Sequence, residues 1–275
     1  MKLSIIYVNH NTQDFLKKSL RSLVSYNLIS DYEVIVVDNA STHFEASSLR
    51  KIFPSVKIVP LTHNIGFGQG NNAGAREASG EYLFFLNTDT ELGSESHLEQ
   101  IIKFLDTHPA YAAAAPLLLL PDKSLQYTQI QHFPSIIRSI LEKPNRFFTN
   151  HLKFLHKLFQ HFGVHYLPDY ECDVDCVSAA AVVVRTDLFN KVGGFDKDYF
   201  MYFEDTDLWK KLHQAGYKIR FFPQSQVIHY ESVSTKAGGR KAYYLKSRAV
   251  YYKKWKSKPR QIMLRLLHLL NKLKD

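Results

Sequence analysis

Signals for strands and helices alternate along the first 120 residues of the chain. Short apolar runs predict strands at residues 3–8, 33–37, 56–61 and 82–86. Helices are predicted between and after them, at residues 12–26, 42–51, 71–79 and 94–107. Strands that alternate with helices form a parallel sheet covered on both faces. The sequence therefore predicts an α/β fold with a mostly parallel central sheet.

The chain continues less regularly after this first part. Residues 121–170 are rich in proline, histidine and aromatic residues, which predicts loops around one amphipathic helix. The later elements are predicted at residues 147–162 (helix), 174–185 (strand), 206–215 (helix) and 218–222 (strand). We expect residues 1–235 to form one domain, in which 121–170 is a variable segment.

Composition limits the cellular setting. The 275 residues, 45% of them hydrophobic, suffice for one large domain with a buried core. The chain has two cysteines, Cys172 and Cys176, and its start resembles a strand rather than a secretory signal. No run of about 18 apolar residues is present, so we expect no membrane-spanning helix. The expected compartment is the cytoplasm, where both thiols stay reduced.

Positive charge is concentrated at the C-terminal end. The net charge is +9, and residues 236–275 hold 13 Lys and Arg residues against one acid. Residues 240–260 add aromatic residues, and 260–274 add an apolar stripe beside basic ones. This basic, aromatic and amphipathic helical tail predicts binding to an anionic membrane surface, at the inner face of the cytoplasmic membrane.

Two other interpretations of the tail remain open. A helix of this composition can pack on the body of the protein or on a partner. A basic aromatic tail also occurs in nucleic-acid-binding proteins. The first 235 residues hold 22 basic and 25 acidic groups, and this near-neutral body argues against a nucleic-acid partner.

Polar residues stand where the predicted strands end. In parallel sheets, ligands bind beyond the carboxyl ends of the strands, and Asn9, Asp38 and Asp89 lie at such ends. The Asp38 carboxylate could accept a hydrogen bond from the edge of a nucleobase. Alternatively, Asp38 could cap the helix that follows it.

A glycine-rich block, residues 64–74, precedes the helix predicted at 71–79. Its glycines could let the backbone approach a ligand and turn N–H groups toward it. The spacing matches neither the dinucleotide-binding pattern nor a P-loop. A tight turn is the alternative.

Two acidic clusters follow apolar segments. The first ends in Asp89, which could bind a divalent metal together with His229 while a diphosphate supplies the other oxygen ligands. The second contains Glu204, Asp205 and Asp207 at the start of a predicted helix. Asp205 could act as a general base, with Glu204 and Asp207 orienting it or meeting basic groups. Alternatively, His229 has only a structural role, and the three acids stabilise the start of the helix by interacting with its dipole.

Five motifs occur in order and together resemble family 2 inverting glycosyltransferases of the Rossmann-like GT-A fold, especially the rhamnosyltransferase-like branch. The resemblance covers residues 2–232. The motifs are Asp38-Asn39-Ala40-Ser41, residues 64–74, Leu86-Asn87-Thr88-Asp89, Gly193-Gly194-Phe195-Asp196 and Phe203-Glu204-Asp205-Thr206-Asp207.

The resemblance implies a nucleotide-sugar donor and a divalent metal, Mg²⁺ or Mn²⁺. It makes Asp205 the catalytic base and Asp89 and His229 the metal ligands. The residues that it assigns to the nucleotide pocket are Asn9, Asp38, Asn64, Gly66, Gly68, Asn72 and Asn87. One departure is Asn87, which stands where the family's metal-binding motif begins with aspartate. Because asparagine lacks the charge of aspartate, the metal affinity could be lower. A degenerate scaffold that keeps the fold without activity is a further alternative.

The activity implied is transfer of a sugar, with rhamnose the leading candidate, to a saccharide or lipid-linked acceptor in surface polysaccharide synthesis. Residues 121–170 are expected to shape the acceptor site. A transferase that uses another UDP- or GDP-sugar is the alternative.

Overall fold

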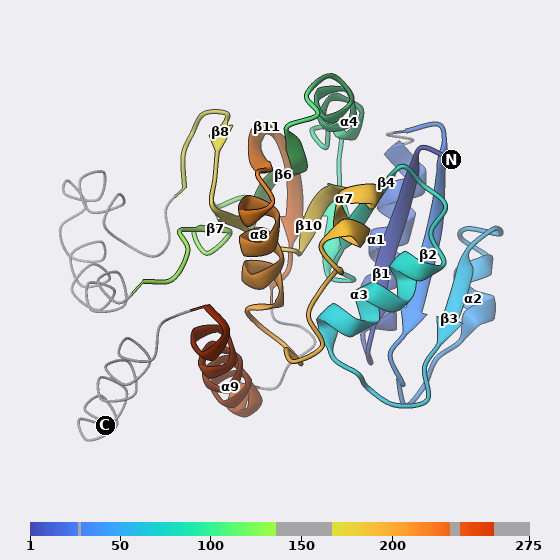
Figure 1. Cartoon of the computed structure of the whole chain (residues 1–275). Coiled ribbons are helices and arrows are strands. Elements are labelled where there is room, and N and C mark those ends of the chain that lie inside the picture. The colour runs from blue at the N-terminus through green and yellow to red at the C-terminus, as the bar shows by residue number, and fades with distance from the viewer. Residues whose placement is uncertain (27–28, 136–166, 232–236, 256–275) are drawn as a thin grey trace.

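The computed structural model describes residues 1–26, 29–135, 167–231 and 237–255 (Figure 1). Within these residues, a main sheet has nine strands and a second sheet has two. The main sheet comprises β1 (Leu3–Asn9), β2 (Tyr32–Asp38), β3 (Lys57–Pro60), β4 (Tyr82–Leu86), β5 (Thr90–Leu92), β6 (Tyr111–Leu119), β8 (Cys172–Asp173), β10 (Ala181–Arg185) and β11 (Lys218–His229). The second sheet pairs β7 (Ile130–Gln131) with β9 (Cys176–Val177).

The sheet is mixed, with a mostly parallel centre. β1 pairs in parallel with β2 and β4, β3 extends the parallel part beyond β2, and β6 pairs in parallel with β11. β10 lies antiparallel between β4 and β6, while β5 and β8 pair antiparallel with β11. This arrangement confirms the predicted α/β class.

The helices are α1 (Gln13–Tyr26), α2 (Ala46–Arg50), α3 (Phe67–Arg76), α4 (Leu98–Thr107), α7 (Thr186–Lys191), α8 (Glu204–Gln214) and α9 (Ala237–Trp255). Side chains alternate along each strand, so the sheet has two apolar faces. On one face, Leu20 of α1 and Ile101 of α4 pack in a cluster with Ile5 of β1. On the other, Leu208 of α8 and Phe189 of α7 pack in a cluster with Phe85 of β4. Helices therefore cover both faces, as predicted.

Several element boundaries differ from the sequence prediction. α3 starts at Phe67, inside the glycine-rich block, and α8 starts at Glu204, so that Glu204 and Asp205 lie in its first turn. The strand predicted at 174–185 is two strands, β9 and β10, separated by residues 178–180. The helix predicted at 147–162 lies outside the described residues.

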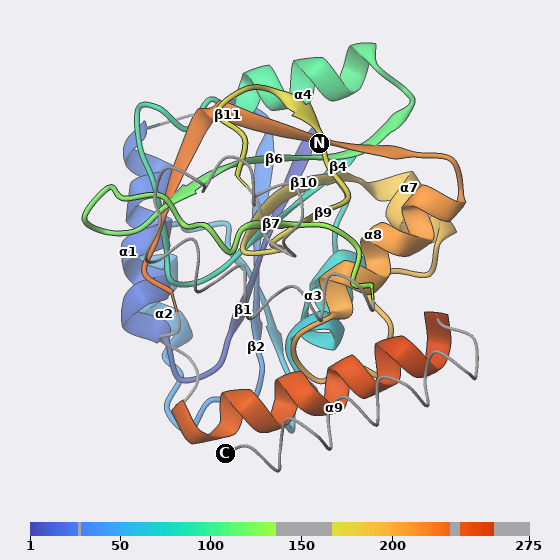
Figure 2. The ribbon, with the colours of Figure 1, turned by 90° about the vertical axis from the view of Figure 1, so that its left-hand side faces the viewer.

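The first half of the predicted tail packs on the protein. In Figure 2, α9 crosses the lower end of the molecule, beneath α3 and the ends of β1 and β2. Tyr251 and Tyr252 of α9 are buried in one apolar cluster with Tyr199 and Phe203. Packing on the body therefore describes α9, whereas residues 256–275 lie outside the described part. Among the described helices, none has the length and apolar character needed to cross a membrane.

Candidate active site

Asn9 and Asp38 meet at the carboxyl ends of β1 and β2. They are register partners in the parallel pair, and both side chains are buried. Asn9 Nδ2 donates to Asp38 Oδ1 at 3.1 Å and to Ser41 Oγ at 2.9 Å. The next helix, α2, has Glu45 at its N-cap position, so the interpretation of Asp38 as a helix cap is wrong. The amide of Asn9 instead fixes the Asp38 carboxylate at the edge of the sheet.

An open cleft of about 780 Å³ lies between the start of α1 and residues 42–45. Thr12 lines the cleft and donates through Oγ1 to Asn9 Oδ1 at 3.1 Å. The turn between β2 and α2 contains Ala40 at φ 58°. Left-handed backbone costs a residue with a Cβ about 1–2 kcal/mol, and such strain concentrates at functional sites.

Asn39 joins this turn to the glycine-rich block. Its Nδ2 donates to Asn64 Oδ1 at 3.0 Å, and its Oδ1 accepts from Ile65 N at 2.9 Å. Asn64 Oδ1 also accepts from Gly66 N at 2.9 Å. Sequence reasoning did not single out Asn39, although it stands inside the Asp38-Asn39-Ala40-Ser41 motif. Asn64 thus shapes the loop, and its contact with a nucleotide stays a prediction.

The glycines of the block let protein atoms, rather than only a ligand, come close. Gly66 has φ 87°, and a Cβ there would lie 2.2 Å from the carbonyl oxygen of Phe200. A Cβ on Gly68 would lie 3.2 Å from Glu204 Cβ. Asn72 exchanges two hydrogen bonds with the backbone of Phe195, at 2.7 and 3.0 Å. The glycine-rich block therefore packs against the segment that leads into the second acidic cluster.

Asp89, which follows β4, and His229, the last residue of β11, form a buried pair. Each residue is 6% exposed, and His229 Nε2 lies 3.3 Å from Asp89 Oδ1. His229 Nδ1 lies 2.9 Å from Gln126 Oε1, which can only accept, so Nδ1 carries a proton. This bond directs Nε2 at the Asp89 carboxylate, an arrangement that a bound cation stabilises.

Carboxylate and imidazole are suitable ligands for Mn²⁺, so these two residues fit a divalent metal. In the described part of the chain, no group of three or more His, Cys, Asp or Glu residues converges as a metal site. Two protein ligands leave coordination positions for the oxygens of a substrate. Asn87 stands two residues before Asp89 in the sequence. Its Oδ1 is buried and has no hydrogen-bond partner among the described residues.

Hydrogen bonds join the three predicted groups of site residues. Thr12, which bonds Asn9, lies 2.8 Å from Thr88 through the two hydroxyl oxygens, and this contact links β1 to the Asn87–Asp89 motif. Asn87 N donates to Ala180 O at 2.8 Å, and the neighbouring Ala179 N–H bonds the Asp205 carboxylate. The predicted nucleotide, metal and base residues therefore lie along one edge of the sheet.

The acids of the second cluster have different environments. Glu204 is buried, and burial, followed by the charge of Asp205, raises its pKa well above the ordinary range. Asp205 is partly exposed, and burial also raises its pKa, although hydrogen bonds from Thr206 and Ala179 oppose that rise. Asp205 Oδ1 accepts from Thr206 N at 2.6 Å. Of the three acids, Asp205 is the one whose residue is partly exposed.

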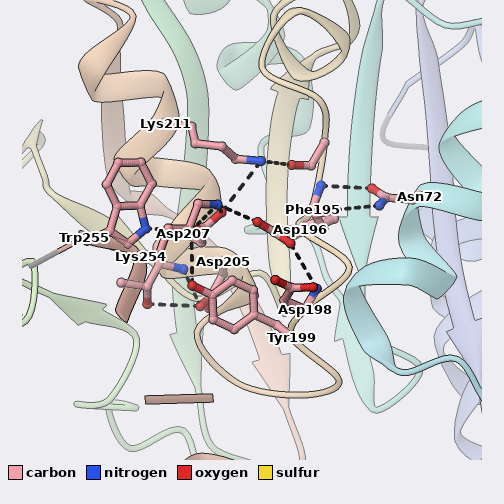
Figure 3. A network of polar contacts seen from close by, with 12 residues as sticks. Asn72, Phe195, Asp196, Asp198, Tyr199, Asp205, Asp207, Lys211, Lys254 and Trp255 are labelled. Atoms are coloured by element: carbon pink, nitrogen blue, oxygen red, sulfur yellow. Dashed lines mark hydrogen bonds and ion pairs between the residues drawn. The ribbon is translucent and has the colours of Figure 1, made fainter. Parts of the chain in front are cut away.

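Asp207 is fully buried and meets basic and aromatic groups (Figure 3). Trp255 Nε1 donates to it at 2.6 Å, Lys254 Nζ at 2.9 Å and the Tyr199 hydroxyl at 3.2 Å. The prediction that Asp207 meets basic groups is correct, and its basic partners are Lys254 of α9 and, at 3.7 Å, Lys211 of α8. Lys254 and Trp255 were missed as site residues because the sequence placed them in a tail.

A family model described as glycosyl transferase family 2 matches residues 4–167, which is more than half of the chain. The chain belongs to glycosyl transferase family 2. This result confirms the resemblance seen in the motifs, and glycosyltransferase activity follows from it.

Two relatives of this glycosyltransferase are rhamnosyltransferases. An N-acetylglucosaminyl-diphospho-decaprenol L-rhamnosyltransferase of Mycobacterium tuberculosis is 28% identical over 250 residues, which cover 85% of this chain and 77% of the relative. The rhamnosyltransferase WbbL of Escherichia coli is 28% identical over 255 residues, which cover 88% of this chain and 89% of the relative.

Two solved structures share the fold. GalNAc-T7 with UDP, GalNAc and Mn²⁺ matches with a TM-score of 0.65 and 15% identity, over 93% of this chain and 48% of that one. The mannosyltransferase PcManGT of Pyrobaculum calidifontis with GDP-Man and Mn²⁺ matches with a TM-score of 0.63 and 18% identity, over 94% of this chain and 66% of that one. These likenesses confirm the GT-A fold.

Proposed function

We propose that this glycosyltransferase moves a sugar, with inversion, from a nucleoside-diphosphate donor to a hydroxyl group of a saccharide or lipid-linked acceptor in surface polysaccharide synthesis. The observation that carries the proposal is the position of residues 179–180, which contact Asn87 on one side and Asp205 on the other. This contact supports a site in which a group held beside Asn87 and Asp89 lies near the carboxylate of Asp205, a partly exposed residue.

Asp205 is the proposed base. Its carboxylate removes the proton from the acceptor hydroxyl, whose oxygen attacks the anomeric carbon from the face opposite the diphosphate. The buried Asn9–Asp38 pair holds the nucleobase, and the Asn87 oxygen, which has no partner among the described residues, faces a polar group of the donor. A divalent ion held by Asp89 and His229 would offset the charge that grows on the leaving diphosphate. A single displacement inverts the anomeric configuration.

Rhamnose is the proposed sugar, because both relatives described above carry rhamnosyltransferase names. A UDP- or GDP-sugar is the alternative, since the solved structures of the fold hold UDP and GDP-Man.

Transfer assays with a panel of nucleotide sugars and Mn²⁺ test the proposal. We expect dTDP-rhamnose to raise the melting temperature and to support transfer. Asp205→Asn should lower kcat by about 10³-fold or more and leave donor binding within a few-fold, because it removes the base and keeps the shape. Transfer that survives Asp205→Asn would show that another group takes the proton.

We also propose that residues 256–275 bring the enzyme to the inner face of the cytoplasmic membrane. The support is their six basic residues beside an apolar stripe, and the lipid-linked substrate named for the Mycobacterium relative. The full chain should sediment with vesicles that contain phosphatidylglycerol and remain unbound with phosphatidylcholine alone. A variant with all six basic residues changed to Gln should lose this binding, and equal binding by the variant would rule the proposal out.

A further inference from the structure

The segment that leads to Asp205 has a strained backbone. Residues 192–203 connect α7 to α8, and Tyr202 and Phe203 have φ angles of 67° and 66°. Left-handed backbone at two successive residues with side chains is unfavourable, so contacts from other elements must hold it. Phe203 is the N-cap of α8, and Asp205 follows in the first turn. The position of Asp205 therefore depends on what holds this segment.

The glycine-rich block holds one side of the segment. Phe67 N donates to Phe200 O at 2.9 Å, where Gly66 leaves no room for a side chain. Asn72 fixes the backbone of Phe195 through two hydrogen bonds. These contacts connect the segment to the proposed donor side of the site.

Helix α9 holds the other side. Ser247 Oγ donates to Met201 O at 2.7 Å, and Tyr243 stacks on Phe200 with 5.0 Å between ring centroids. The ring of Phe203 lies 5.4 Å from that of Tyr251, centroid to centroid. Successive residues of the strained segment thus face α9 and would lose these contacts if the helix moved.

One ammonium group fastens both ends of the segment. Lys254 Nζ lies 2.5 Å from Asp196 Oδ2, before the strained residues, and 2.9 Å from the Asp207 carboxylate, after them (Figure 3). Trp255 Nε1 adds a second donor to Asp207 at 2.6 Å. Asp207 is fully buried, and its other cation, Lys211 of α8, lies farther away, with Nζ 3.7 Å from the carboxylate. A buried carboxylate that loses its nearer cation is destabilised. Together these contacts make the end of α9 a clamp.

We propose that α9 positions the catalytic base, and that Lys254 and Trp255 are positioning residues which act on Asp205 through Asp196 and Asp207. The inference rests on the proposed role of Asp205. Residues 237–255 then belong to the catalytic domain in function, although they follow the family's motifs in the sequence.

The test compares variants of the full chain in transfer kinetics and in hydrogen exchange. Lys254→Met removes the shared cation, Trp255→Phe removes one donor and keeps an aromatic ring, and Lys254→Arg keeps the charge. Lys246→Met is the matched control, because Lys246 is an exposed lysine of the same helix. We expect Lys254→Met to lower kcat by about 10- to 100-fold with the donor KM within about twofold. Trp255→Phe should give a smaller loss of the same kind.

Two readouts separate positioning from a merely stabilising role. Amides 197–206 should exchange faster in Lys254→Met, while those of residues 64–74 exchange at the wild-type rate. Lys254→Arg should keep kcat near the wild-type value, in contrast to Lys254→Met. Lys246→Met should match the wild type in kcat and in exchange rates. A lower melting temperature with unchanged kcat, or a loss of donor affinity equal to the loss of kcat, would overturn the proposal. If the wild type transfers no sugar, the proposed function fails, and the exchange rates still decide whether Lys254 clamps the segment. Trp255→Phe serves both measurements if Lys254→Met does not fold.

Discussion

At the scale of single residues, three acids that are close neighbours in the sequence differ in burial and in hydrogen-bond partners. Glu204 is buried, Asp205 is partly exposed, and Asp207 is buried with Lys254 and Trp255. Different environments give neighbouring carboxyl groups different protonation states. The sequence could locate the cluster, but only the fold shows which of the acids is partly exposed.

The raised pKa of Glu204 has a consequence for stability. In the folded protein burial raises the pKa of Glu204 well above the value of 4.5 that it has in the unfolded chain. Raising the pH above that value therefore favours the unfolded state. Glu204→Gln, which is neutral at every pH, should melt at a higher temperature than the wild type at pH 8 and differ little at pH 4. Equal melting temperatures at pH 8 would show that Glu204 is not held neutral.

Gln126 should orient His229, the proposed metal ligand. Its side-chain oxygen accepts the Nδ1 proton at 2.9 Å and thereby turns Nε2 toward Asp89. Gln126→Leu should weaken Mn²⁺ binding about tenfold, measured from the electron paramagnetic resonance signal of free Mn²⁺. Gln126→Glu keeps an acceptor and should bind at least as tightly as the wild type. Unchanged affinity in Gln126→Leu would contradict this role.

At the scale of elements, the glycine-rich block joins two halves of the site. The sequence predicted that the glycines let other groups approach the backbone closely. In the structure, atoms of Phe200 and Glu204 are among the groups that do so. Periodicity and strand ends could predict most of the elements. They could not predict that Phe200 contacts this block or that α9 packs on Tyr199 and Phe203, because those contacts join segments far apart in the chain.

Gly66 should therefore tolerate no side chain. Gly66→Ala would place a methyl group 2.2 Å from Phe200 O at a residue with φ 87°, and we expect a loss of about 2–3 kcal/mol in the free energy of unfolding by urea. Gly93→Ala is the control, because nothing lies within 4 Å of its Cβ position. Similar losses in both variants would contradict the packing described for Gly66.

At the scale of the whole molecule, residues from five separated motifs meet at one edge of the sheet. Asn9 and Asp38 could be placed there from the sequence, since parallel strands end at the same side. The link through Ala179 and Ala180 could not, because the predicted strand 174–185 hid the break between β9 and β10 in which they lie. For α9 the sequence left packing on the body open as an alternative to membrane binding, and its aromatic side chains pack on the protein.

A crystal structure of the protein with Mn²⁺ and dTDP tests the central claim most directly. We predict an anomalous Mn²⁺ peak in contact with the Asp89 carboxylate, His229 Nε2 and the diphosphate, with the base beside Asp38 and the β-phosphate directed toward Asp205. A nucleotide bound away from Asp38, or a diphosphate separated from Asp205 by the body of the sheet, would contradict the claim that these residues form one active site.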